Sequence, residues 1–129
     1  MRSEYNPDMP EQVTVYVVDD EPVIASTLAA ILNASGFRAT AYTSAEDAIR
    51  AAECEGPSLL ISDVVMPGMN GVDLAIHLKS LCPKCKVLLF SGQAATNDLL
   101  ESARRAGHDF ELLSKPIHPK DLLAAIRKL

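Results

Sequence analysis

Tryptophan, cysteine and long apolar runs are scarce in this sequence. Its 129 residues include no tryptophan and three cysteines. No apolar run approaches the roughly 20 residues of a membrane-spanning helix. Residues 1–12 hold no apolar stretch of the kind that marks a secretory signal. An odd number of cysteines without an export signal favours a reducing compartment over a disulfide framework. We therefore expect a cytoplasmic protein that does not associate with membranes.

Basic residues are fewer than acidic residues. Twelve Lys and Arg residues face 17 Asp and Glu residues, for a formal net charge of −5. Such a surface repels a phosphate backbone, so we expect no direct contact with nucleic acid. A chain of this length has room for one domain. Residues 1–12 are polar and contain Pro7 and Pro10, which predicts a disordered leader before a domain formed by residues 13–129.

Apolar segments of strand length alternate with segments of helical periodicity. The predicted strands are Val13–Val18, Phe37–Thr43, Leu59–Ser62, Lys86–Phe90 and Phe110–Leu113. Four of these five are almost continuously apolar, which is typical of a parallel sheet that is covered on both faces. The order strand–helix, repeated along the chain, predicts an α/β protein. We expect a flavodoxin-like, doubly wound sandwich whose parallel five-stranded sheet has the order 2-1-3-4-5.

Polar residues stand at the carboxyl ends of four predicted strands. Asp19 and Asp20 follow the first strand, and Asp63, Ser91 and Lys115 follow the third, fourth and fifth. Each has an ordinary explanation as a helix cap, a turn residue or a solvated side chain. Together, however, the three carboxylates would repel one another by a few kcal/mol per close pair at an effective dielectric of about 20. Oxygen ligands without His or Cys nearby favour Mg²⁺ or Mn²⁺ as the cation that relieves this repulsion.

The same residues suit phosphoryl transfer. A carboxylate can attack phosphorus and form an acyl phosphate. The reaction requires a metal ion near the phosphoryl oxygens, a second cation and a hydroxyl or backbone donor. Asp63, the acidic pair, Lys115 and Ser91 supply these groups.

Four blocks of sequence carry a resemblance to a known family. They are Val17–Pro22 (VVDDEP), Ile61–Gly71 (ISDVVMPGMNG), Ser91–Gly92 and Lys115–Pro116. In this order, at the ends of the predicted strands, they resemble the receiver domain of two-component response regulators. The resemblance covers residues 13–129. It implies that Asp63 is the phosphoacceptor, that Asp20 and Asp63 bind Mg²⁺ directly and that Asp19 binds it through water.

The resemblance implies further roles. The backbone carbonyl of Val65 would bind the metal ion, Ser91 and Lys115 would contact the phosphoryl group, and the Lys115–Pro116 peptide bond would be cis. In the family an aromatic residue usually stands three positions before the lysine and moves together with the hydroxyl residue. Here that switch position is Leu112. We therefore expect Ser91 and Leu112 to act as the switch, with a smaller rearrangement than an aromatic ring would produce.

The implied partner is a sensor histidine kinase or a phosphotransfer protein. Receivers use the face formed by the fourth helix, the fifth strand and the fifth helix to dimerise or to bind partners, which here corresponds to residues 96–129. The chain would accept and lose its own phosphoryl group rather than turn over a substrate.

Two alternatives stay open. A pseudo-receiver that serves only as an interaction module usually lacks one site residue, and this chain lacks none. A phosphatase with an aspartyl nucleophile commonly places that nucleophile after the first strand with a second Asp two residues later, whereas Asp19 and Asp20 are adjacent. A nucleotide-hydrolysing P-loop is excluded because the sequence G-x-x-x-x-G-K-[ST] is absent.

Several other residues are predicted to have no chemical role. Cys82 and Cys85 form a C-x-x-C that follows a predicted helix, whereas a redox pair should begin one. With His77 they offer only three zinc ligands, and no second C-x-x-C is present. We expect a plain loop there and solvated side chains for His108 and His118.

Overall fold

The computed structural model describes residues 13–92 and 96–129. The leader predicted for residues 1–12 lies outside the described residues. Strands and helices alternate through the described part of the chain, as predicted. The strands are β1 Thr14–Val18, β2 Arg38–Tyr42, β3 Leu59–Asp63, β4 Lys86–Ser91 and β5 Glu111–Ser114. The helices are α1 Pro22–Ala34, α2 Ala45–Cys54, α3 Gly71–Leu81, α4 Thr96–Arg105 and α5 Pro119–Arg127.

The strands form one parallel sheet in the order β2-β1-β3-β4-β5. This confirms the predicted fold class and strand order. Three strands, β3, β4 and β5, extend one residue further than predicted at their carboxyl ends. Asp63 thereby pairs in register with Phe90, and Ser91 pairs with Ser114. Asp63 and Ser91 are thus held by the sheet itself and not by a loop, which limits their freedom to move.

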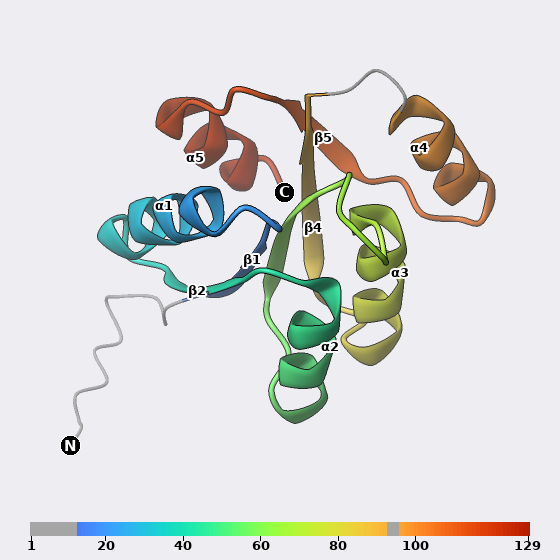
Figure 1. Ribbon diagram of the computed structural model, residues 1–129, viewed down its shortest axis with the longest axis horizontal. Helices are drawn as coiled ribbons and strands as arrows, with labels where there is room; N and C mark the ends of the chain where they lie inside the picture. Colours follow the sequence, from blue (N-terminus) through green and yellow to red (C-terminus); the bar gives the residue numbers. More distant parts are fainter. Residues whose placement is uncertain (1–12, 93–95) are drawn as a thin grey trace.

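Helices cover both faces of the sheet. In Figure 1, α1 and α5 lie on one side and α2, α3 and α4 lie on the other. The alternation of side chains along β1 shows the consequence, because Val15 and Val17 pack in the α1/α5 cluster while Tyr16 and Val18 pack in the opposite one. Burial on both faces explains why the central strands are almost continuously apolar.

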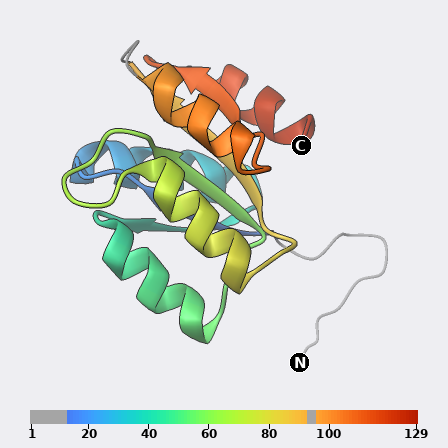
Figure 2. The ribbon, with the colours of Figure 1, turned by 90° about the vertical axis from the view of Figure 1, so that its right-hand side faces the viewer.

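The edges of the sheet differ from its centre. Every residue of β3 is buried, whereas β5 has exposed residues along most of its length. Figure 2 shows β5 at one edge of the molecule between α4 and α5. Within the described residues, no helix is long and apolar enough to cross a membrane.

The predicted helix ends agree with the backbone. Gly36 follows α1 and Gly107 follows α4, with φ of 98° and 97°, values that L side chains rarely adopt. Pro22 and Pro119 are the first residues of α1 and α5. Because all five strands are parallel, their carboxyl ends lie along the same end of the sheet.

Candidate functional site

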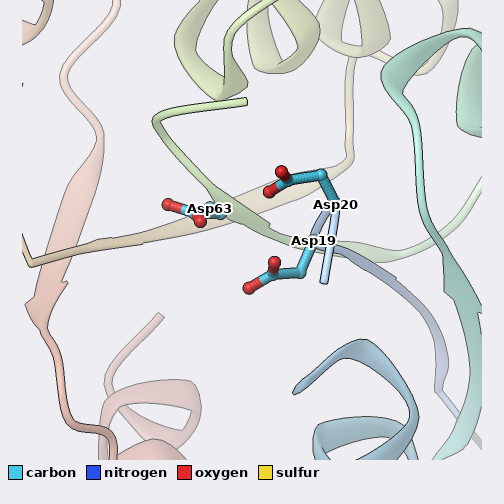
Figure 3. Close-up of side chains that lie close together, drawn as sticks. All are labelled: Asp19, Asp20 and Asp63. Atoms are coloured by element: carbon cyan, nitrogen blue, oxygen red, sulfur yellow. The ribbon is translucent and has the colours of Figure 1, made fainter. Parts of the chain in front are cut away.

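Three carboxylates meet at the carboxyl edge of the sheet. Asp19 and Asp20 come directly after β1, and Asp63 is the last residue of β3. Figure 3 shows their side chains gathered around one space, and one oxygen from each lies within 4.8 Å of the others. Asp19 and Asp63 are buried, whereas Asp20 is exposed. Among the described residues this is the one group of His, Cys, Asp and Glu side chains with the spacing of a metal site.

Both carboxylate oxygens of Asp63 accept hydrogen bonds. Oδ1 accepts a hydrogen bond from the backbone N–H of Val65 (3.2 Å), and Oδ2 accepts one from Lys115 Nζ (3.0 Å). Its backbone is fixed as well, because the N-terminal residue of α3, Gly71, lies directly against it. A Cβ at Gly71 would stand 2.1 Å from the Asp63 carbonyl oxygen, so only glycine fits there.

Asp19 has one satisfied and one unsatisfied carboxylate oxygen. Oδ1 accepts a hydrogen bond from the backbone N–H of Glu21 at 2.8 Å. Oδ2 is buried and has no hydrogen-bond donor among the described residues, and Lys115 Nζ lies 3.6 Å away. Burial raises the pKa of the Asp19 carboxyl, and the Glu21 N–H and the Lys115 charge offset this only in part.

The helix-cap explanation accounts for little of the acidic pair. The N-cap of α1 is Glu21, and α1 has no side-chain cap. Asp19 bonds the backbone of that N-cap residue through one oxygen only. A buried carboxylate oxygen without a donor, next to two further carboxylates, is an arrangement that a hard cation or its bound water satisfies. These oxygen ligands therefore fit Mg²⁺.

Lys115 joins the two buried carboxylates. Its Nζ lies 3.0 Å from Asp63 Oδ2 and 3.6 Å from Asp19 Oδ2, and a quarter of its side chain is exposed. Burial alone would lower the pKa of Lys115, but the hydrogen bond and charge of Asp63 outweigh it and raise the pKa. The backbone N–H of Lys115 donates to the carbonyl oxygen of Ser91 at 3.0 Å, and the Lys115–Pro116 peptide bond is cis.

The other expected site residues lie nearby with different surroundings. Ser91 is buried at the end of β4, beside Lys115 through that backbone hydrogen bond. Val65 contacts Asp63 through its N–H, and its side chain is 42% exposed. Leu112 lies on the edge strand β5 and is 36% exposed, so the switch position faces outward in this structure.

One neighbour of the site was missed by sequence reasoning. Phe90 is fully buried in β4, and Lys115 Nζ lies 5.2 Å from the centroid of its ring. A phenylalanine inside an apolar strand is ordinarily a core residue, so nothing in the local sequence singled it out. Its position directly before Ser91, at the carboxyl end of the predicted fourth strand, was the available signal. In the structure Phe90 pairs in register with Asp63.

Cys82 and Cys85 lie in the connection between α3 and β4, as expected for a plain loop. Cys82 is the C-cap of α3, and Cys85 is buried, which raises its pKa to about 11. The expectation of a solvated His108 was wrong, because its ring stacks on Phe110 with a centroid separation of 5.6 Å and is only partly exposed.

Comparison with known proteins agrees with this geometry. The family model described as "Response regulator receiver domain" matches residues 15–127. The chain is 33% identical over 119 residues to the "Probable transcriptional regulatory protein TcrX" of Mycobacterium tuberculosis, covering 92% of this chain and 50% of that protein. It is 30% identical over 115 residues to the "Response regulator receiver protein CpdR" of Brucella abortus, covering 89% of this chain and 94% of that protein.

A solved structure gives the same result. The "response regulator receiver domain protein (CheY-like)" of Methanospirillum hungatei is 26% identical and superposes with a TM-score of 0.81, covering 91% of this chain and 92% of that one. The chain spans about half the length of TcrX, so its match there is to one part of a longer protein. The chain belongs to the response regulator receiver domain family, the signalling domains of two-component systems.

Proposed function

We propose that this chain accepts a phosphoryl group on Asp63 from the phosphohistidine of a sensor histidine kinase or a phosphotransfer protein. The proposal rests mainly on the environment of Asp63, whose carboxylate lies 3.0 Å from Lys115 Nζ and within 4.8 Å of two further carboxylates. A nucleophile, a cation and a metal-binding group thus converge on one point. Family membership supports the same assignment.

The residues that would hold Mg²⁺ are Asp20, Asp63, the carbonyl of Val65 and, through water, Asp19. Three carboxylates without His or Cys, together with the unsatisfied Oδ2 of Asp19, support this set. When bound, Mg²⁺ supplies positive charge that offsets the negative charge of the phosphoryl oxygens.

The chemistry of the chain's own residues is simple. An Asp63 oxygen attacks phosphorus, the new O–P bond forms as the donor's N–P bond breaks, and the electron pair stays on the imidazole nitrogen, which takes up a proton from water. Lys115 already lies within hydrogen-bond distance of Asp63 and would pair with a phosphoryl oxygen. Ser91, at the adjoining strand end, would donate its hydroxyl to another.

The alternatives find less support. A pseudo-receiver usually lacks part of the site, whereas Asp19, Asp20, Asp63 and Lys115 are all present and lie together. An aspartyl phosphatase would place its nucleophile after β1, where Asp19 is buried and bonded to Glu21. We expect stoichiometric phosphorylation without turnover. A dimer through α4, β5 and α5 and the absence of direct nucleic-acid contact are further parts of the proposal, the latter supported by the net charge of −5.

Phosphorylation should depend on Asp63. Incubation with acetyl phosphate and Mg²⁺ should add about 80 Da to the intact mass of the wild-type chain, the increment of one phosphoryl group. Asp63→Asn should show no such adduct because the amide is not a nucleophile toward phosphorus. The control is Asp98→Asn, an exposed carboxylate on α4. An adduct that persists in Asp63→Asn would contradict the assignment.

Mg²⁺ affinity should distinguish the two residues of the acidic pair. Asp20→Asn removes a direct ligand, whereas Asp19→Asn removes a partner that acts through water and is typically worth about 10–100-fold in affinity. Calorimetric titration should therefore show the greater loss for Asp20→Asn. Wild-type affinity in that variant would overturn the ligand assignment.

The buried Asp19 should make the metal-free protein less stable at neutral pH. The folded-state pKa of Asp19 is raised, so the folded protein favours the protonated carboxyl. The protonated carboxyl therefore contributes stability that is present below the unfolded-state pKa and is lost as the pH rises through the folded-state pKa. In EDTA, Asp19→Asn should increase the free energy of unfolding at pH 7 by about 1–3 kcal/mol, with a smaller gain near pH 4. Urea titration measures both values. An equal or larger gain near pH 4 would contradict the account.

The output face should respond to activation. Beryllofluoride with Mg²⁺ mimics the acyl phosphate, and its effect should spread from Asp63 to residues 96–106 and 119–129. A differential stabilisation of roughly 3 kcal/mol is enough for a switch of about 150-fold. Chemical-shift mapping measures the spread, and shifts confined to the rim around Asp63 would exclude signalling through this face.

The switch position itself can be tested at Leu112. This residue is 36% exposed, so Leu112→Tyr should change the free energy of unfolding by no more than about 0.5 kcal/mol. We expect the ring to enlarge the beryllofluoride-induced shifts on α5. Smaller beryllofluoride-induced shifts in Leu112→Tyr than in the wild type would contradict this expectation.

A further inference from the structure

Phe90 lies next to Lys115 of the site and has no role in the chemistry described so far. It is among the largest side chains that are fully buried, and Lys115 Nζ stands over its ring at 5.2 Å from the centroid. The same Nζ lies 3.0 Å from Asp63 Oδ2 and 3.6 Å from Asp19 Oδ2, so the ring is a third neighbour of the Lys115 charge.

The backbone around Phe90 is firmly held. Its carbonyl oxygen accepts a hydrogen bond from the N–H of Val64 at 3.0 Å, immediately after Asp63, and the two strands are in register at Asp63 and Phe90. The side chain packs in the α1/α5 cluster. The other buried members of that cluster in the described part of the chain are all aliphatic. Burial alone therefore does not call for an aromatic residue at this position.

We infer that Phe90 is a positioning residue, whose ring face holds the Lys115 ammonium at the point from which it reaches both Asp63 and Asp19. The face of an aromatic ring is electron-rich and attracts a cation within about 6 Å of its centroid. A lysine side chain is long and flexible, and a quarter of this one is exposed, so two carboxylates alone leave it free to swing toward solvent. The inference rests on the proposed function, because it assigns Lys115 to the phosphoryl group.

Phosphorylation kinetics test the inference with a double-mutant cycle. Phe90→Leu should slow labelling by acetyl phosphate and Mg²⁺ by about threefold to tenfold, from the strength of a partly buried cation–π contact. In a Lys115→Ala background the same change should have no further effect, because Phe90 acts through the lysine. Equal slowing in both backgrounds would mean a general packing defect and would overturn the inference. Leu88→Val, in the same strand and cluster, controls for loss of core volume.

Ring fluorination separates charge from shape. Site-specific replacement of Phe90 by a polyfluorinated phenylalanine keeps the size of the side chain and withdraws electron density from its face. This variant should fold as the wild type does and still label more slowly. It carries the kinetic test if Phe90→Leu does not fold, and an unchanged rate would overturn the inference.

An NMR measurement decides the geometry without phosphorylation. The Phe90 ring current should displace the Lys115 Cε methylene resonances of the full chain, and Phe90→Leu or the fluorinated variant should move them. If the wild-type chain takes no phosphoryl group from acetyl phosphate, the proposed function fails while this measurement still decides the position of Lys115. Lys115 resonances that stay unchanged in both variants would overturn the inference whatever the kinetics show.

Discussion

Three carboxylates repel one another at the carboxyl ends of β1 and β3, and the surrounding structure has to compensate for this repulsion. At 4.8 Å, a pair of unit charges repels by about 3 kcal/mol at an effective dielectric of about 20. Lys115 relieves part of this through contacts with Asp63 and Asp19, yet Asp19 Oδ2 stays buried without a hydrogen-bond donor among the described residues. The site thus has a surplus of negative charge, which suits a divalent cation and, through it, a phosphoryl group.

The sheet makes this concentration of charge tolerable. Asp63 is a strand residue with paired neighbours, and the close approach of Gly71 to its carbonyl leaves its backbone little room to move. The apolar clusters on both faces of the sheet bury most of the central strands and stabilise the fold, so the edge can hold groups that oppose folding. Ser91 pairs with Ser114 of β5, and the backbone N–H of Lys115 donates to the Ser91 carbonyl. Both site residues are therefore joined to the strand that lies between α4 and α5 (Figure 2).

Much of this could be predicted from the sequence, for identifiable reasons. Continuous apolar strands separated by helices, with right-handed connections, leave few topologies open. In a parallel sheet the carboxyl ends of the strands lie together, which predicts that Asp19, Asp63 and Lys115 are neighbours. Contacts between distant side chains were harder to foresee. The strand order predicted that β4 and β5 are neighbours, but it does not determine the conformation of the long Lys115 side chain, which brings Nζ over the Phe90 ring. The stacking of His108 on Phe110 was missed because His108 was assigned to a solvated loop and Phe110 to the first position of the fifth strand.

We expect the acyl phosphate to form on the carboxylate at the end of β3 and not on the acidic pair after β1. Borohydride reduces an acyl phosphate to an alcohol and so converts the modified Asp to homoserine. The most direct measurement is peptide mapping by mass spectrometry after acetyl phosphate, Mg²⁺ and borohydride treatment of the wild-type chain. Homoserine should appear at Asp63 alone. Homoserine at Asp19 or Asp20, or at none of the three, would contradict it.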